Sequence, residues 1–251
     1  MADPKVVLIT CGGSEVGRAT ALLLAHEGAR LVLGGSNTGD GEETARLARQ
    51  AGGEAVFMRT EISEEEEVRM LVNLAVITYG RLDAAFNNAT VQSHHHAPLT
   101  QQNATDFDAV MRVVVRGIYL SMKYEIPQMI KGGGGSIVNM GSIGSLVGLA
   151  NAAPFAASQH AILGLTRSAA LEVARQGIRV NLISPAAIET RRGIRFPWAE
   201  LPPEVQLGTH PPMGRACKPE EIARAVAWLC SDASAYFTGQ SLTVDGGYTA
   251  Q

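Results

Sequence analysis

The stretch KVVLITCGGSEVGRATALLLAHEG, residues 5–28, decides the fold class. Its first part, 5–10, is a short and largely apolar run, which is typical of a strand buried on both faces. From Ser14 onward the apolar residues recur at helical spacing, with Ser14 suited to cap the start of a helix and Gly28 to end it. A buried strand that leads directly into an amphipathic helix predicts an α/β fold.

The same alternation of strands and helices continues to the end of the chain. Further strands are predicted at 30–35, 54–62, 82–89, 135–142, 178–185 and 240–247. Helices are predicted at 39–53, 63–80, 103–130, in the segment that follows 142, and at 218–232. This order predicts one doubly wound, seven-stranded parallel sheet, and therefore a single domain over 1–251. The long irregular segment 186–217, rich in proline, arginine and aromatic residues, is predicted to be a substrate lid within it.

Composition narrows the classes of protein to which the chain can belong. Of the 251 residues, 46% are hydrophobic and 18% are charged, which is typical of a globular domain. The net charge of −3 argues against nucleic acid or an anionic membrane as a partner. Three widely spaced cysteines favour a reducing compartment, and no apolar run approaches the length of a membrane span. We therefore expect a cytoplasmic protein.

Five segments further along the chain point to a known family. They are NNA (87–89), GSIVN (135–139) leading to Ser142, SAALE (168–172), RVNLISP (179–185) and GQSLTVDGG (239–247). In this order they resemble the short-chain dehydrogenase/reductase family over essentially the full length. The resemblance implies a Rossmann-like sheet with strand order 3-2-1-4-5-6-7 and a ligand cleft at the carboxyl ends of the strands. It also implies a homodimer or homotetramer assembled through the long helices around 110–124 and 160–174.

Several positions that bind the dinucleotide in this family are changed. The family's glycine-rich turn, TGxxxGxG, reads TCGGSEVG at 10–17, so Cys11 and Glu15 replace two glycines. Glu15 is expected to occupy the anion site and to repel a phosphate about 4 Å away by roughly 1–4 kcal/mol. Gly35 stands where an acidic residue would bind the adenosine ribose. These changes predict that no cofactor is bound. If NAD or NADP did bind, the resemblance implies contacts with Gly17, Asn88 and Thr190.

The catalytic positions are changed as well. Ser142 is kept, but Phe155 stands where the family has its tyrosine, and Gln159 stands where it has its lysine. Val114 replaces the asparagine of the long helix. Phenylalanine has no proton to give and glutamine has no charge, whereas positioned acid–base groups are worth roughly 100- to 10,000-fold in rate. The substitutions therefore predict that the chain does not transfer hydride.

The loop SHHHAPL (93–99) offers another source of acid–base chemistry. His94, His95 and His96 titrate near neutral pH and follow a strand beside Ser142. General acid–base work, an oxyanion contact or a plain solvated loop all remain open. A metal site is not expected, because three consecutive side chains do not point in one direction. The predicted catalytic residues are Ser142, His94, His95 and His96.

The remaining positions around the predicted cleft are mainly apolar. The predicted substrate pocket consists of Val91, Met140, Phe155, Gln159, Ala186, Ile188, Phe196 and Trp198. Such a pocket favours a hydrophobic carbonyl or phenolic compound of the natural-product type. The first hypothesis is a cofactor-independent isomerase, dehydratase, lyase or cyclase. The alternatives are an NAD(P)-dependent oxidoreductase with a weakened site and a non-catalytic pseudoenzyme that binds a ligand or partner.

Overall fold

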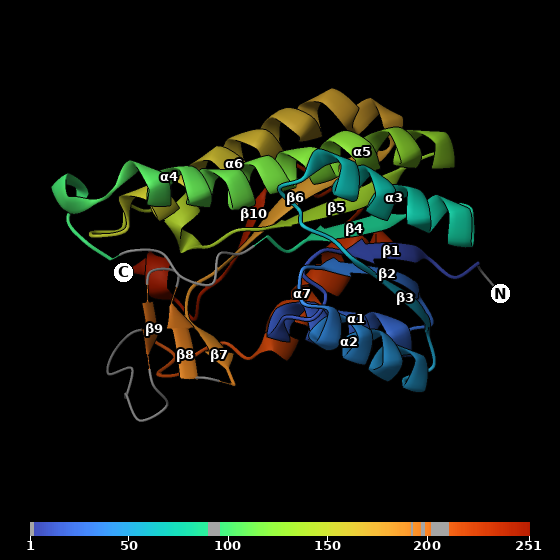
Figure 1. The fold of residues 1–251 in the computed structure, drawn as a ribbon, viewed down its shortest axis with the longest axis horizontal. Helices are drawn as coiled ribbons and strands as arrows, with labels where there is room; N and C mark the ends of the chain where they lie inside the picture. Colours follow the sequence, from blue (N-terminus) through green and yellow to red (C-terminus); the bar gives the residue numbers. More distant parts are fainter. Residues whose placement is uncertain (1–2, 90–95, 192, 197–198, 202–210) are drawn as a thin grey trace.

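The computed structural model describes residues 3–89, 96–191, 193–196, 199–201 and 211–251 (Figure 1). A seven-stranded parallel sheet forms the centre of the fold, in the order β10-β6-β5-β4-β1-β2-β3. Its strands are β1 (Val6–Ile9), β2 (Arg30–Gly35), β3 (Glu54–Arg59), β4 (Ala84–Asn87), β5 (Gly135–Met140), β6 (Ile178–Pro185) and β10 (Ser241–Val244). With β10 as the seventh strand, the predicted order 3-2-1-4-5-6-7 is confirmed.

Helices cover both faces of this sheet (Figure 1). One face carries α1 (Glu15–His26), α2 (Thr38–Gln50) and α7 (Pro219–Cys230). The other carries α3 (Glu65–Tyr79), α4 (Ala104–Val110), α5 (Gly117–Gly132) and α6 (Ala153–Val173). A π-helical segment, Met111–Arg116, joins α4 to α5, so the helix predicted at 103–130 is continuous but locally widened around Val114. Short 3-10 turns occupy Leu99–Gln101, Ile143–Ser145, Ala174–Gln176, Asp232–Ser234 and Tyr248–Ala250.

The alternation of side chains along β1 explains the two-sided core. Val6 and Leu8 pack into the cluster formed with α3, α5 and α6, whereas Val7 and Ile9 pack into the cluster formed with α1, α2 and α7. All four side chains are buried, which is why the sequence of this strand is apolar at every position. None of the helices in the described part of the chain is both long and apolar enough to span a membrane.

A small second sheet lies within the segment that was predicted to be a lid. Strands β7 (Ile188–Thr190), β8 (Gly193–Phe196) and β9 (Ala199–Leu201) pair antiparallel in the order β7-β8-β9. Figure 1 shows this sheet below the carboxyl ends of the central strands. The region is therefore less irregular than its composition suggested. Its role as a substrate lid stays a prediction.

Two helical glycines provide a matched test of the packing around α1. A methyl group on Gly17 would lie 2.4 Å from the backbone oxygen of Cys11, whereas one on Gly164 of α6 would meet nothing within 4 Å. We expect Gly17→Ala to lower the free energy of unfolding by about 1–3 kcal/mol through overpacking. Gly164→Ala should raise it by about 0.5–1 kcal/mol, because alanine has the better helix propensity. Denaturant titration of both variants checks the pair, and equal effects would contradict the close packing at Gly17.

Candidate functional site

The loops that follow β1, β4, β5 and β6 meet at the carboxyl edge of the sheet. They carry the turn at 11–17, Asn88, Ser142 and Ala186. In parallel sheets with helices on both faces, ligands bind at this edge. The residues that the sequence indicated therefore come from four separate loops onto one side of the molecule.

The turn after β1 keeps a left-handed backbone although its first glycine is replaced. Cys11 has a φ of 47°, a conformation that glycine adopts most readily. The amide of Gly12 donates to the Gly34 oxygen over 2.9 Å, and the amide of Ser14 donates to the Cys11 oxygen over 3.0 Å. The chain therefore follows a tight path into α1 despite the cysteine. Gly17 is required there, since a Cβ would collide with the Cys11 oxygen.

Asn88 braces this turn from the neighbouring strand. Its backbone amide donates to Thr10 Oγ1 over 2.9 Å, and its side-chain Nδ2 donates to Ser14 Oγ over 2.8 Å. Ser14 Oγ in turn accepts from the amide of Gly17 over 3.2 Å and so caps α1 as predicted. Asn88 is 2% exposed, which means that its hydrogen bonds form away from competing water.

The start of α1 offers backbone donors to an anion. The amides of Glu15 and Val16 have no acceptor within the described residues. Such amides, together with the helix dipole, bind phosphate groups at helix N-termini. Gly35 lies beside the same turn, and a Cβ placed on it would come no closer than 3.5 Å to Cys11 Cα. These residues therefore fit the diphosphate and adjoining ribose of a dinucleotide.

Glu15 lies in the first turn of α1, and its occupation of the anion site stays a prediction. Its side chain is only partly buried and lines a cavity of about 390 Å³. Three cations line the same cavity, namely Arg18, Arg191 and Lys218. Arg18 also pairs with Asp40 over 3.6 Å, and solvent screens the repulsion between the partly buried Glu15 and a bound phosphate. Sequence reasoning missed Arg18 and Lys218. The one available signal was the position of Arg18 one helical turn after Ser14.

Ser142 and Gln159 converge at the floor of the candidate site. A Cβ placed on Gly144 would lie 3.0 Å from Ser142 Oγ and 3.4 Å from Gln159 Cγ. Ser142 Oγ accepts from the Gly144 amide over 3.0 Å, and its own proton has no acceptor among the described residues. Gln159 is 3% exposed, and its Oε1 lacks a hydrogen-bond donor in the same part of the chain. Phe155 lies one turn earlier on α6 and is partly buried.

The structure brings together only part of the predicted apolar pocket. Met140 and Ile188 belong to one buried cluster, while Phe196 packs separately against Ala187 and Ala216. Ala186 is buried as well. His96 is exposed, and the hydroxyl of Thr190 donates to the Gly193 oxygen over 3.0 Å. Val91, His94, His95 and Trp198 lie outside the described residues.

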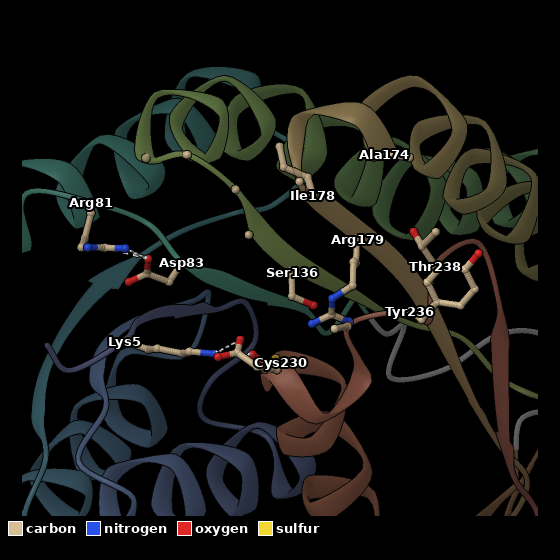
Figure 2. Close-up of a pocket in the computed structure, with 17 residues that line it drawn as sticks. Lys5, Arg81, Asp83, Ser136, Ala174, Ile178, Arg179, Cys230, Tyr236 and Thr238 are labelled. Atoms are coloured by element: carbon tan, nitrogen blue, oxygen red, sulfur yellow. Dashed lines mark hydrogen bonds and ion pairs between the residues drawn. The ribbon is translucent and has the colours of Figure 1, made fainter. Parts of the chain in front are cut away.

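A second cavity, of about 740 Å³, lies at the opposite, amino-terminal edge of the sheet (Figure 2). Its cations already have partners: Lys5 pairs with Asp232 over 2.9 Å, and Arg81 pairs with Asp83 over 2.6 Å. Arg179 donates to two backbone oxygens at the end of α7 over 2.8 and 3.0 Å. Figure 2 shows Arg81 turned toward Asp83 and Lys5 toward the end of α7. Lys5 and Arg179 stabilise the C-terminus of that helix, so the cavity is a weaker candidate than the carboxyl edge.

A parallel, doubly wound sheet whose first strand leads through a tight turn into a helix is a fold of the Rossmann type, a class in which dinucleotides commonly bind at such a turn. The family described as enoyl-(acyl carrier protein) reductase matches residues 13–249. The chain is 38% identical to the 2,5-dichloro-2,5-cyclohexadiene-1,4-diol dehydrogenase of Sphingobium indicum, over 98% of this chain and 97% of that one. It is also 38% identical to the cyclohexanol dehydrogenase of an Acinetobacter species, over 98% and 96% of the two chains. The structure of NAD+-bound xylitol dehydrogenase superposes with a TM-score of 0.88 at 34% identity, over 97% and 98% of the chains. The chain therefore belongs to the short-chain dehydrogenase/reductase family.

Two predictions from the sequence are wrong in the light of these relatives. The relatives are named dehydrogenases, and one structural neighbour carries bound NAD+. This contradicts both the expected absence of a cofactor and the non-redox isomerase, dehydratase, lyase or cyclase. The physical reason lies in the turn after β1, whose backbone path, brace and unpaired amides survive the substitution of Cys11 and Glu15.

The hydrogen bond between Asn88 and Ser14 should strengthen dinucleotide binding, because it holds the turn after β1 in place. Asn88→Ala removes the hydrogen bond to Ser14, which should loosen the turn and weaken NAD(H) or NADP(H) binding about tenfold, the equivalent of one hydrogen bond. Asn103→Ala is the matched control, since Asn103 caps the distant helix α4. Nicotinamide fluorescence titration measures both affinities. Equal affinities of the two variants would contradict the role of Asn88.

Proposed function

We propose that this protein is an NAD(P)-dependent oxidoreductase that interconverts a ring alcohol and the corresponding ketone on a small six-membered carbocycle. The observation that carries the proposal is the turn after β1, which Asn88 holds and where the amides of Glu15 and Val16 have no acceptor in the described part of the chain. The names of two relatives, a cyclohexanol dehydrogenase and a dichlorocyclohexadiene-diol dehydrogenase, support this substrate class. Buried Met140 and Ile188 suit an apolar ring.

The cofactor-binding residues that we propose are Gly17, Asn88 and Thr190. Gly17 allows the turn to approach the diphosphate, Asn88 holds that turn, and Thr190 lies on β7 in the wall of the adjoining cavity. Arg18, Arg191 and Lys218 offset the negative charge of the diphosphate. When bound, the dinucleotide supplies the hydride acceptor or donor.

Ser142 is the proposed hydrogen-bonding partner of the substrate oxygen. Its proton is available for donation, because its oxygen already accepts from the Gly144 amide. Phe155 and Gln159 supply no proton, so in alcohol oxidation the hydroxyl proton leaves toward water past Ser142. The loop histidines His94, His95 and His96 remain proposed acceptors for it.

We further propose a cytoplasmic homo-oligomer that forms through α5 and α6. Tyr119 and Ile130 of α5 and Leu171 of α6 are exposed, and a second copy of the chain would cover such apolar side chains. Cys217 and Cys230 are free thiols, which fits a reducing compartment. Light scattering of the purified protein tests the assembly, and a monomer would contradict it.

A spectroscopic assay with a simple ring alcohol tests the proposed reaction. We expect purified protein to reduce NAD+ or NADP+ in the presence of cyclohexanol, with Ser142→Ala lowering kcat by about tenfold or more through loss of a hydrogen bond to the reacting oxygen. Linear alcohols of equal carbon number serve as the substrate control. The proposal fails if neither dinucleotide binds in a calorimetric titration.

Introducing a tyrosine at position 155 and a lysine at position 159 tests whether the absence of an acid–base pair limits the reaction. The double variant Phe155→Tyr with Gln159→Lys should raise kcat by about 100-fold, the lower range for positioned acid–base catalysis. Each single variant should give much less, since the lysine charge acts by lowering the pKa of the tyrosine. Thermal unfolding confirms that the buried position 159 accepts lysine. A folded double variant with unchanged kcat would show that proton transfer does not limit the reaction.

A further inference from the structure

A buried polar cluster lies under the carboxyl edge of the sheet, outside the site described above. It consists of Asn87 on β4, Asn139 on β5, Glu125 on α5 and Thr166 on α6, all of them fully buried. Asn87 Nδ2 donates to Glu125 Oε2 over 2.9 Å and to Asn139 Oδ1 over 3.0 Å. Asn139 Nδ2 donates to Thr166 Oγ1 over 3.0 Å. One network therefore joins two central strands to the two helices that cover them.

Two acceptors in this network lack a donor. Asn87 Oδ1 and Glu125 Oε1 are buried, and neither has a hydrogen-bond partner within the described residues. Buried polar atoms in native structures are almost always paired, so such a coincidence requires an explanation. A single proton on Glu125 Oε1 would turn this oxygen into a donor, and Asn87 Oδ1 is a partnerless acceptor on the side chain that already bonds Glu125 Oε2.

The surroundings of Glu125 also favour the neutral acid. Burial raises the pKa of its carboxyl group to about 7, although the hydrogen bond from Asn87 acts in the opposite direction. Charged groups on the neighbouring helices are engaged elsewhere: Lys123 and Tyr124 of α5 both contact Glu65 of α3, and Arg167 of α6 is exposed. The polar side chains that β4 and β5 contribute to the network are the uncharged amides of Asn87 and Asn139. No cation in this part of the structure therefore stabilises a carboxylate at position 125.

We propose that Glu125 is a neutral carboxylic acid in the folded protein, that it donates its proton to Asn87 Oδ1, and that this two-point pair positions the nucleotide-binding turn. Asn87 ends β4, and the next residue is Asn88, which holds Ser14 and Thr10. Asn139 lies three residues before Ser142 on the neighbouring strand. The pair thus fixes the strand ends on which both halves of the candidate site depend. Its effect on dinucleotide binding rests on the proposed function, whereas its effect on stability does not.

Because the pKa of Glu125 is raised in the folded protein, stability should fall as the pH rises. Stability from the protonated pair is fully present at low pH and is lost as the pH rises through about 7. Above that pH, a carboxylate oxygen would face the unpaired Asn87 Oδ1, and the end of β4 would loosen. Dinucleotide affinity should then fall with rising pH, by at most about tenfold per pH unit, the limit for one proton.

The variant Glu125→Gln tests this directly, because glutamine reproduces the protonated pair at every pH. Its Nε2 donates to Asn87 Oδ1, and its Oε1 accepts from Asn87 Nδ2. Relative to this variant, we expect the unfolding midpoint of the wild type to decline between about pH 4.5 and about pH 7, and its dinucleotide affinity to decline as the pH rises above about 7. Glu65→Gln is the matched control, since Glu65 is a partly exposed carboxylate on α3 that pairs with Lys123. It should keep the wild-type decline.

Infrared spectroscopy provides a readout that a merely structural role would not give. The wild type at about pH 6, below the raised pKa, should show the carbonyl band of a protonated carboxyl group, and Glu125→Gln should lack it. Isotopic labelling of glutamate in the wild type assigns the band even if the variant does not fold.

The outcomes separate this inference from the proposed function. Absence of the band, or equal pH profiles of the wild type and Glu125→Gln, would overturn the neutral pair. A pH-dependent stability with pH-independent affinity would overturn its positioning role. If no dinucleotide binds at any pH, the proposed function fails, while the stability and infrared measurements still decide the state of Glu125.

Discussion

The hydrogen bond from Asn88 Nδ2 to Ser14 Oγ joins the two strand ends on which the site depends. It connects the loop after β4 to the turn after β1, and the same serine oxygen accepts from the first turn of α1. The Asn88 amide adds a second contact to Thr10, so the turn is held from two sides. A left-handed cysteine costs roughly 1–2 kcal/mol of backbone strain, and a turn held this firmly can tolerate that cost. The substitution at position 11 therefore changes the side chain without changing the path of the chain.

The fold could be predicted from the sequence because the patterns that indicate its strands and helices are local and recur along the chain. The alternation of short apolar runs with amphipathic helices fixes a parallel sheet, and Ser14 caps α1 as its position indicated. The antiparallel strands β7, β8 and β9 could not be predicted in this way. They are only three or four residues long, and proline and arginine hide their pattern.

The candidate site was predicted less well, because its properties depend on contacts between distant residues. Ser142 and Gln159 do converge around Gly144, as their motif spacing suggested. Glu15, however, lines the same cavity as Lys218, which is about two hundred positions away in the chain. A comparison with the glycine-rich motif counts Glu15 only as a replaced glycine. It contains no information on a cation that another helix or strand places nearby. Glu125 was overlooked for a similar reason, since a single glutamate in a helix is normally solvated.

A member of this family can lose its tyrosine and lysine and remain an oxidoreductase if orienting the reactants contributes more to the rate than acid–base catalysis does. Acid–base groups contribute roughly 100- to 10,000-fold to a rate, whereas holding two reactants in the right orientation reaches effective molarities of about 10⁵–10⁸ M. Phe155 and Gln159 remove the first contribution only. The second depends on the turn after β1, on Ser142 and on the buried network beneath them, and all three are intact. In the proposed oxidoreductase, the site that orients a dinucleotide beside a ring alcohol therefore retains the larger share of catalysis, so the loss of the proton-transfer residues is by itself weak evidence against hydride transfer.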